Sequence, residues 1–198
     1  MRVLIACECS GVVRRAFIEA GHDAWSCDLL PAFDQSPAHI QGDVLELLAR
    51  DPRWDLLIAH PPCTHLACSG ARWFREKGDV QAQAVVFART LLETAIPHVC
   101  LENPIGILST HLRQPDQIIQ PWQFGHGETK ATCLWLTRLP RLVPTAMVAG
   151  RVPRVHHEAP GPDRWLRRSV TLPGIAAAMA AQWSDPMTFT LQSEWVAR

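Results

Sequence analysis

The stretch Arg2-Val3-Leu4-Ile5-Ala6-Cys7-Glu8-Cys9-Ser10-Gly11 decides the fold of this chain. Its apolar first half predicts a short buried strand, and its small-residue second half predicts a tight turn. An amphipathic helix follows over residues 12–20, where Gly21 ends it, and residues 23–27 form a second strand with Asp28 at its tip. A strand-turn-helix-strand unit of about 30 residues is the opening of a Rossmann-like sheet.

Strands and helices continue to alternate along the rest of the chain. The predicted strands are residues 40–43, 54–59, 98–101, 118–124 and 132–136, and the predicted helices are 44–50, 79–96 and a last one that Thr171 caps before Pro173. The inner stripes are Val80, Ala84, Phe87, Leu91 and Ala95 on the long helix, and Ile175, Met179 and Trp183 on the last one. Residues 60–78 and 138–168 are predicted loops. This alternation predicts an α/β fold with a mostly parallel sheet and helices on both faces.

The composition fits one soluble globular domain over residues 1–198, with a hydrophobic fraction of 47% and a formal net charge of zero. A neutral chain has no overall attraction to nucleic acid. The charge is uneven, because residues 1–137 have a net charge of −4 and residues 138–198 one of +4. The Pro/Arg-rich loop 138–168 is therefore open to two interpretations, an edge that faces a polyanion or a solvated arginine-rich loop.

Two features of the sequence bear on the compartment in which the protein works. Met1-Arg2 leads directly into a strand without the apolar segment of a signal peptide, and no apolar run reaches membrane-spanning length. Seven cysteines without an export signal predict reduced thiols. We therefore expect a cytoplasmic location and no membrane contact.

Five residues with polar or nucleophilic side chains fall at the carboxyl ends of predicted strands, which is the edge where open α/β sheets bind ligands: Glu8, Asp28, Asp43, Cys63 and Glu102. The turn at residues 8–11 lacks the three glycines of a dinucleotide site, which disfavours pyrophosphate. Asp28 is placed to accept hydrogen bonds from a ribose diol, and Asp43 to accept one from an adenine amino group. A nucleoside cofactor without phosphates, such as S-adenosylmethionine, fits this set. The alternative for each aspartate is a helix cap.

Cys63 and Glu102 carry the reactive chemistry in this interpretation. Pro61 and Pro62 fix the backbone before Cys63, whose thiol needs a positive neighbour or a helix N-terminus to lower its pKa. A desolvated Glu102 is expected to have a raised pKa and to carry a proton at neutral pH. A thiolate that adds to C6 of cytosine and an acid that holds a proton at N3 together activate the ring. The alternatives are a buried inert cysteine and an exposed loop carboxylate.

On these residues, in this order, the chain resembles the cytosine-C5 DNA methyltransferases, in the compact form carried by phages and prophages. The matching segments are residues 1–137 and 169–183, the latter resembling the family's last motif, which folds back onto the cofactor pocket. The resemblance implies a Rossmann-like methyltransferase fold, S-adenosylmethionine as methyl donor, DNA as partner, attack by Cys63 on C6, and contact of Glu102 with N3. It also implies a bacterial or phage-infected host cell.

The resemblance also assigns the remaining site residues to a cofactor set and a substrate set. The cofactor set is Glu8, Cys9, Ser10, Gly11, Asp28, Leu29, Asp43, Val44, His60 and Pro61. The substrate set is Pro62, Thr64, Asn103, Pro104, Thr132, Arg151, Arg154, Arg167 and Arg168. The sequence departs from the family in three places: residues 7–12 replace a glycine-rich opening, Thr64 stands where glutamine is usual, and Lys130 is the candidate for an absent arginine element. Lys130 is therefore the third predicted catalytic residue, a cation that lowers the pKa of the Cys63 thiol or positions the base. Only 37 residues separate Lys130 from Arg168, too few for a target-recognition domain, so loose sequence preference is expected.

Several alternatives stay open at this point. His60, Cys63, His65 and Cys68 have types and spacing that suit zinc. The acceptor is either DNA, duplex or single-stranded, or a cytosine nucleotide such as dCMP, for which no base flipping is needed. A non-catalytic relative that binds nucleic acid, and a one-carbon donor other than methyl, are further alternatives. The oligomeric state is open as well.

Overall fold

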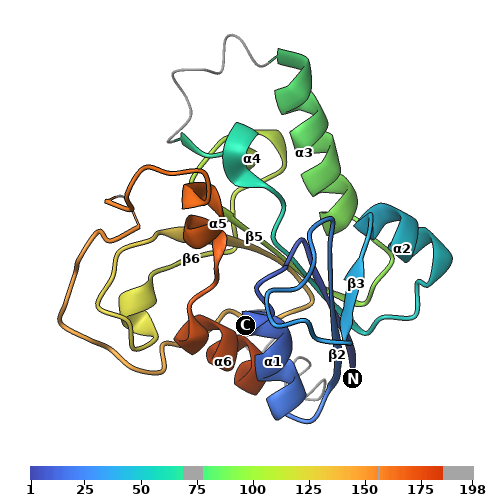
Figure 1. The fold of residues 1–198 in the computed structure, drawn as a ribbon, viewed down its shortest axis with the longest axis horizontal. Coiled ribbons are helices and arrows are strands. Elements are labelled where there is room, and N and C mark those ends of the chain that lie inside the picture. The colour runs from blue at the N-terminus through green and yellow to red at the C-terminus, as the bar shows by residue number, and fades with distance from the viewer. Residues whose placement is uncertain (69–77, 156, 185–198) are drawn as a thin grey trace, which may run out of the picture.

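The computed structural model describes residues 1–68, 78–155 and 157–184, which form one seven-stranded sheet with helices around it (Figure 1). The strands are β1 (Arg2–Ala6), β2 (Asp23–Asp28), β3 (His39–Gln41), β4 (Leu56–Ala59), β5 (His98–Pro104), β6 (Gln117–Ile119) and β7 (Thr132–Thr137). Their order in the sheet is β3-β2-β1-β4-β5-β7-β6, and β7 is the strand that runs antiparallel to its neighbours. The predicted Rossmann-like α/β fold with a mostly parallel sheet is confirmed.

The helices cover both faces of this sheet, as predicted. They are α1 (Val12–Glu19), α2 (Val44–Arg50), α3 (Gly78–Leu92), α4 (Leu108–His111), α5 (Arg164–Ser169) and α6 (Pro173–Gln182), with short 3-10 turns at Cys63–His65 and Pro121–Gln123. Side chains of α1 and α6 pack on one face, and those of α2, α3 and α4 on the other. In Figure 1, α1 and α6 lie side by side, away from α2 and α3.

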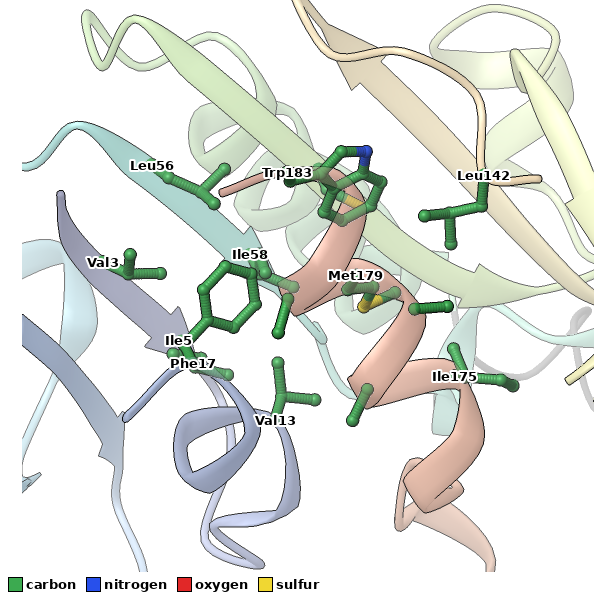
Figure 2. Packing of buried hydrophobic residues seen from close by; sticks show 14 of the residues in the cluster. Val3, Ile5, Val13, Phe17, Leu56, Ile58, Leu142, Ile175, Met179 and Trp183 are labelled. Carbon is green, nitrogen blue, oxygen red and sulfur yellow. The ribbon is translucent and has the colours of Figure 1, made fainter. Parts of the chain in front are cut away.

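The alternation of β1 divides its side chains between the two cores. Val3 and Ile5 point toward α1 and α6, while Leu4 points to the opposite face. Figure 2 shows Phe17 of α1 and Trp183, just after α6, in one apolar cluster with Ile58 between them. Burial of each such side chain stabilises the fold by about 1.5–3 kcal/mol.

Several predicted element boundaries are wrong. The strand predicted at 118–124 ends at Ile119, because Pro121 cannot donate to a ladder and starts a 3-10 turn. The helix predicted at 79–96 ends at Leu92, before Pro97, which disfavours helical backbone at the residue preceding it. The predicted loop 138–168 contains the start of α5 at Arg164. The residue at the cap of α6 is Leu172 rather than Thr171, with Pro173 first in the helix as expected.

The inner face of α3 agrees with the middle of the predicted stripe, because Leu91 is buried and Ala84 and Phe87 pack against the core, but not with its two ends. Val85, Ala88 and Leu91 are its buried residues, whereas Val80 and Ala95 are exposed. Ala95 lies past the helix end, and Val80 belongs to its first turn. Gly21, by contrast, has a φ of +85° after the last turn of α1, the left-handed position in which a glycine ends a helix.

Candidate functional site

The two motifs predicted to act together are neighbours at the carboxyl edge of the sheet. β4 and β5 pair in parallel, so the residues at the ends of both strands emerge on the same side. His60 Nδ1 lies 3.1 Å from Glu102 Oε2, and their side chains are only 10% and 15% exposed. His60, predicted for the cofactor, is thus committed to Glu102 instead.

Residues 60–68, the Cys63 loop, are fixed against the end of β5 and the turn that follows it. The buried Asn103 donates from Nδ2 to the carbonyl oxygen of Pro61 over 2.7 Å. Two backbone hydrogen bonds add to this: Ile107 N to Leu66 O at 2.9 Å, and Cys68 N to Ile105 O at 3.0 Å. Asn103 therefore positions the loop, a role that its place in the substrate set did not anticipate.

Gly106 makes the close contact between the two segments possible. A Cβ atom at this position would overlap the carbonyl group of Leu66 and crowd Ala67. Ala67 and Gly106 also form an isolated antiparallel bridge. The requirement here is space for backbone on backbone, since any side chain would push the Cys63 loop away from β5.

The surroundings of Cys63 raise the pKa of its thiol rather than lower it. Burial and the neighbouring Glu102 carboxylate raise the pKa of the Cys63 thiol, whereas Lys130 and Arg168 lower it. The expected net lowering is wrong for the protein without substrate, because desolvation outweighs the two cations. Lys130 nevertheless acts in the predicted direction, and Arg168 is a second cation close to the sulfur that sequence reasoning placed only in the substrate set.

The expected raised pKa of Glu102 is also wrong. Burial raises the pKa of this carboxyl group, but the His60 hydrogen bond, the charges of His60 and Lys130, and a Thr132 hydrogen bond together lower it below its usual value. Glu102 is therefore a carboxylate in this structure. His60 Nε2 is buried and has no hydrogen-bond partner within the described residues.

Lys130 and Glu102 share a small cavity, which is lined by Glu102, Lys130, Thr132, Thr171, Leu172, Ile175 and Met179. Lys130 Nζ donates to Val170 O over 3.3 Å, so the chain before α6 holds it in place. The segment expected to fold onto the cofactor pocket closes this cavity instead. The three predicted catalytic residues, Cys63, Glu102 and Lys130, are brought within electrostatic reach of one another.

A second cavity, of about 120 Å³, opens at the carboxyl ends of β1 and β2 and is lined by Cys7, Cys27, Asp28, Leu29, Gly42, Asp43, Val44, Pro62 and Phe87. It collects Asp28, Leu29, Asp43 and Val44 from the predicted cofactor set. Pro62 connects this cavity to the Cys63 loop. Sequence reasoning missed Phe87 as a lining residue, although it placed this side chain on the inner face of its helix.

The two aspartates of this cavity also accept hydrogen bonds from nearby backbone amides. Asp43 Oδ1 accepts from Leu45 N over 2.7 Å and caps α2, so the helix-cap alternative holds for this residue. Asp28 Oδ1 accepts from Leu30 N over 2.9 Å. Two carboxylates beside mostly apolar walls match a nucleoside, whose ring is apolar on its faces and whose hydroxyl and amino groups donate hydrogen bonds. The cavity therefore fits the nucleoside part of S-adenosylmethionine.

The turn at residues 8–11 and Pro61 belong to the predicted cofactor set but do not line that cavity. The buried Glu8 accepts hydrogen bonds from Val13 N at 2.8 Å and Arg14 N at 3.3 Å, so it neutralises the start of α1. Gly11, with a φ of +70°, has Arg14 packed against it. The contacts of this turn therefore stabilise the connection between β1 and α1, which is formed by Glu8, Cys9, Ser10 and Gly11.

Most of the arginines predicted to hold substrate are engaged within the protein. Arg154 pairs with Glu128 at 2.9 Å and Arg167 with Glu158 at 2.6 Å. Arg151 lies over the ring of Trp122, 4.0 Å from its centroid. Thr64 lies in the 3-10 turn that begins at Cys63, and Pro104 ends β5.

The spacing that suggested zinc does not produce a ligand cluster. Within residues 1–68, 78–155 and 157–184, no group of three or more His, Cys, Asp or Glu side chains is arranged to hold a metal ion. Every helix in the described part of the chain is too short or too polar to serve as a membrane span.

No family model matches this chain, and a search of curated proteins finds no match either. Solved structures are similar at low identity. A DNA modification methyltransferase encoded within a prophage (E. coli) has 15% identity and a TM-score of 0.49 over 80% of this chain and 55% of that one. The Dnmt2 methyltransferase of S. pombe has 16% identity and a TM-score of 0.48 over 79% of this chain and 54% of that one. A DNMT2 mutant from Spodoptera frugiperda has 13% identity and a TM-score of 0.44 over 76% of this chain and 54% of that one. The chain spans little more than half the length of these structures.

Proposed function

We propose that this protein transfers a methyl group from S-adenosylmethionine to C5 of cytosine in a nucleic acid, DNA in the first place. The observation that carries the proposal is the junction of the Cys63 loop with β5, which brings Cys63, Glu102 and Lys130 to one edge of the sheet. A cavity with two aspartates and mostly apolar walls adjoins that junction through Pro62. The motif resemblance supplies the same roles for the same residues.

The protonation states of the resting site suggest the first step. Cys63 is held as a thiol and Glu102 as a carboxylate. When a cytosine lies between them, the thiol proton passes to Glu102 and on to N3 of the ring, while Cys63 Sγ forms a bond to C6. No outside base is needed, because the pyrimidine nitrogen takes the proton that the sulfur loses.

Each neighbouring residue has a part in this exchange. Lys130 and Arg168 stabilise the negative charge that develops on the sulfur before it bonds to C6. His60 holds the Glu102 carboxyl group in one orientation. S-adenosylmethionine supplies, when bound, the electrophilic methyl group. The C5 proton then passes to solvent water, and the bond between Sγ and C6 breaks as the C5=C6 double bond re-forms. N3 returns its proton through Glu102 to the sulfur, so Cys63 is a thiol again.

The test is incubation with labelled S-adenosylmethionine and, in separate reactions, dCMP, single-stranded DNA and duplex DNA, followed by mass spectrometry of the nucleosides. We expect 5-methylcytosine from at least one acceptor and none with Cys63→Ala. Label on another base, on another position of cytosine, or undiminished 5-methylcytosine with Cys63→Ala contradicts the proposal. A labelled cytosine that carries a larger one-carbon group would change the donor and leave the role of Cys63 intact.

A further inference from the structure

Helix α5 borders the site, although its residues lie about 100 positions after Cys63 in the sequence. Arg168, in its last turn, is close enough to Cys63 to lower the pKa of the thiol. Val170, directly after the helix, accepts the hydrogen bond from Lys130. Any molecule that presents a ring to Cys63 therefore meets this helix as well.

Trp165 is the exposed aromatic residue of this helix. Its exposed fraction is 58%, and it lies three positions before Arg168, so the two side chains start from neighbouring points on one side of α5. Exposed aromatic rings beside arginines are what single-stranded nucleic acids stack on.

The charge of Arg168 is available to such a strand. Arg168 has no ion-pair partner among the described residues, whereas Arg154 and Arg167 are held by Glu128 and Glu158. The segment 138–168 as a whole carries seven arginines against two acidic residues, which gives a net charge of +5. A polyanion is therefore the partner that complements this edge.

We propose that a single-stranded nucleic acid lies along the face of α5 that carries Trp165 and Arg168, with a base next to the target cytosine stacked on Trp165 and a phosphate on Arg168. This inference rests on the proposed function and specifies its acceptor. A polynucleotide strand, rather than dCMP, then makes the contacts that hold the cytosine at Cys63.

The number of engaged arginines favours a single strand over a duplex. Three of the seven arginines of this segment are engaged, since Arg151 stacks on Trp122 and Arg154 and Arg167 are in ion pairs, which reduces the number of phosphate contacts that the segment can make. Binding to a duplex without base-specific contacts depends on many phosphate contacts. An unpaired base, in contrast, can lie flat on an indole ring, which provides affinity that requires no charge.

The experiment measures binding and methyl transfer separately. Fluorescence anisotropy of a labelled 12-nucleotide strand with one cytosine reports binding to the full chain, wild type or variant. We expect Trp165→Ala to weaken binding by about 5- to 100-fold and Trp165→Phe to restore most of it, because alanine removes a stacking surface and phenylalanine retains one. Arg168→Gln should reduce the slope of log affinity against log salt by about 0.7, the loss of one phosphate contact.

The matched controls are Met147→Ala and Arg141→Gln. Met147 is another exposed apolar side chain of the same segment, and Arg141 follows β7 at the opposite edge of the sheet from Cys63. Both controls should leave strand affinity within about twofold of the wild type.

Unchanged strand affinity with Trp165→Ala, or tighter binding of duplex than of single strand, overturns this inference. Faster methylation of dCMP than of the strand overturns it as well. These outcomes leave the proposed chemistry in place. Conversely, strand binding that depends on Trp165 without any methylated cytosine would reject the proposed function and retain the binding face.

Discussion

Asn103 donates its side-chain amide to the carbonyl oxygen of Pro61, and this 2.7 Å hydrogen bond lies inside the protein, joining the strand that bears Glu102 to the loop that bears Cys63. The bond spans 42 positions in sequence. It sets the distance between a sulfur and a carboxyl group without touching either, so its loss should change chemistry and stability together.

Asn103→Leu tests this link. The substitution leaves the Pro61 carbonyl buried without its donor, so we expect a loss of stability of about 1–3 kcal/mol and slower methyl transfer. Thermal unfolding and turnover on a single-stranded substrate measure the two effects. Gln114→Ala, which removes an exposed amide that bonds Ser109 O, is the control and should change neither. An Asn103→Leu enzyme with wild-type turnover would show that the Cys63 loop is positioned by its other contacts.

Glu102→Gln keeps the size of the side chain and removes its ability to relay a proton. We expect a rate about 10²–10⁴-fold lower than that of the wild type, measured as single-turnover methyl transfer. The exposed Cys68 supplies the comparison for the sulfur, because Cys68→Ala should retain activity while Cys63→Ala loses it. Equal rates for Glu102→Gln and wild type would remove the carboxyl group from the mechanism.

The raised pKa of Cys63 predicts how fast the thiol is alkylated at different pH values. Because the thiolate reacts, alkylation by iodoacetamide should increase with pH and reach its midpoint above the usual cysteine value of about 8.5. Lys130→Met should move the midpoint higher still, since it removes a cation that favours the thiolate. Mass spectrometry of the peptide that contains Cys63 gives both curves. A midpoint that falls in the Lys130 variant would contradict the assigned role of this cation.

Gly106→Ala tests the contact between backbones at the turn after β5. The added methyl group overlaps Leu66 O, so the Cys63 loop must move outward. We expect turnover to fall at least 10²-fold, in the range known for small misplacements of reacting groups. Gly78→Ala is the matched control, because a Cβ atom there meets nothing within 4 Å and the residue lines neither cavity. If both variants keep full activity, the close packing at Gly106 has no part in aligning the site.

Asp34 and Arg14 provide a test of stability away from the site. The Arg14 side chain is fully buried and lies 2.5 Å from Asp34, and with Arg15 it outweighs the effect of burial and lowers the pKa of Asp34 to about 2. Asp34→Asn leaves a buried cation without its partner, so we expect a loss of about 3 kcal/mol near neutral pH. Because the folded pKa of Asp34 is depressed, this stabilisation is present above about pH 4 and lost as the pH falls toward 2.

Urea unfolding of the wild type and of Asp34→Asn at several pH values measures this difference. Their stabilities should converge as the pH falls below about 4, the usual pKa of an aspartate. A difference that stays constant down to pH 2 would assign the effect of the substitution to packing rather than to charge.

The order of elements could be predicted because strand periodicity and breaker residues are local signals. Pro61 and Pro62 end one strand, and Pro173 starts the last helix. The two ends of the inner stripe of α3 could not be predicted reliably, since they depend on where the helix ends relative to the sheet. Within the candidate site, the residues that lie together could be predicted from their positions at the ends of strands, because parallel strands end at one edge of the sheet.

The protonation of those residues could not be read from the same pattern. A carboxyl group that is only desolvated has a raised pKa, but His60 lies beside Glu102 and reverses the direction. That partnership comes from the pairing of β4 with β5, which is tertiary information. In the same way, Glu8 has the sequence features of a ligand group, while the structure uses it to satisfy the start of α1.

The tight fit of Gly106 against Leu66 also bears on how this scaffold can be altered. With no side chain between them, the segments 60–68 and 102–107 share one rigid interface, and neither can be exchanged alone without a clash or a gap. A graft that aims to give the scaffold a different reactive chemistry should therefore transplant both segments as a single cassette.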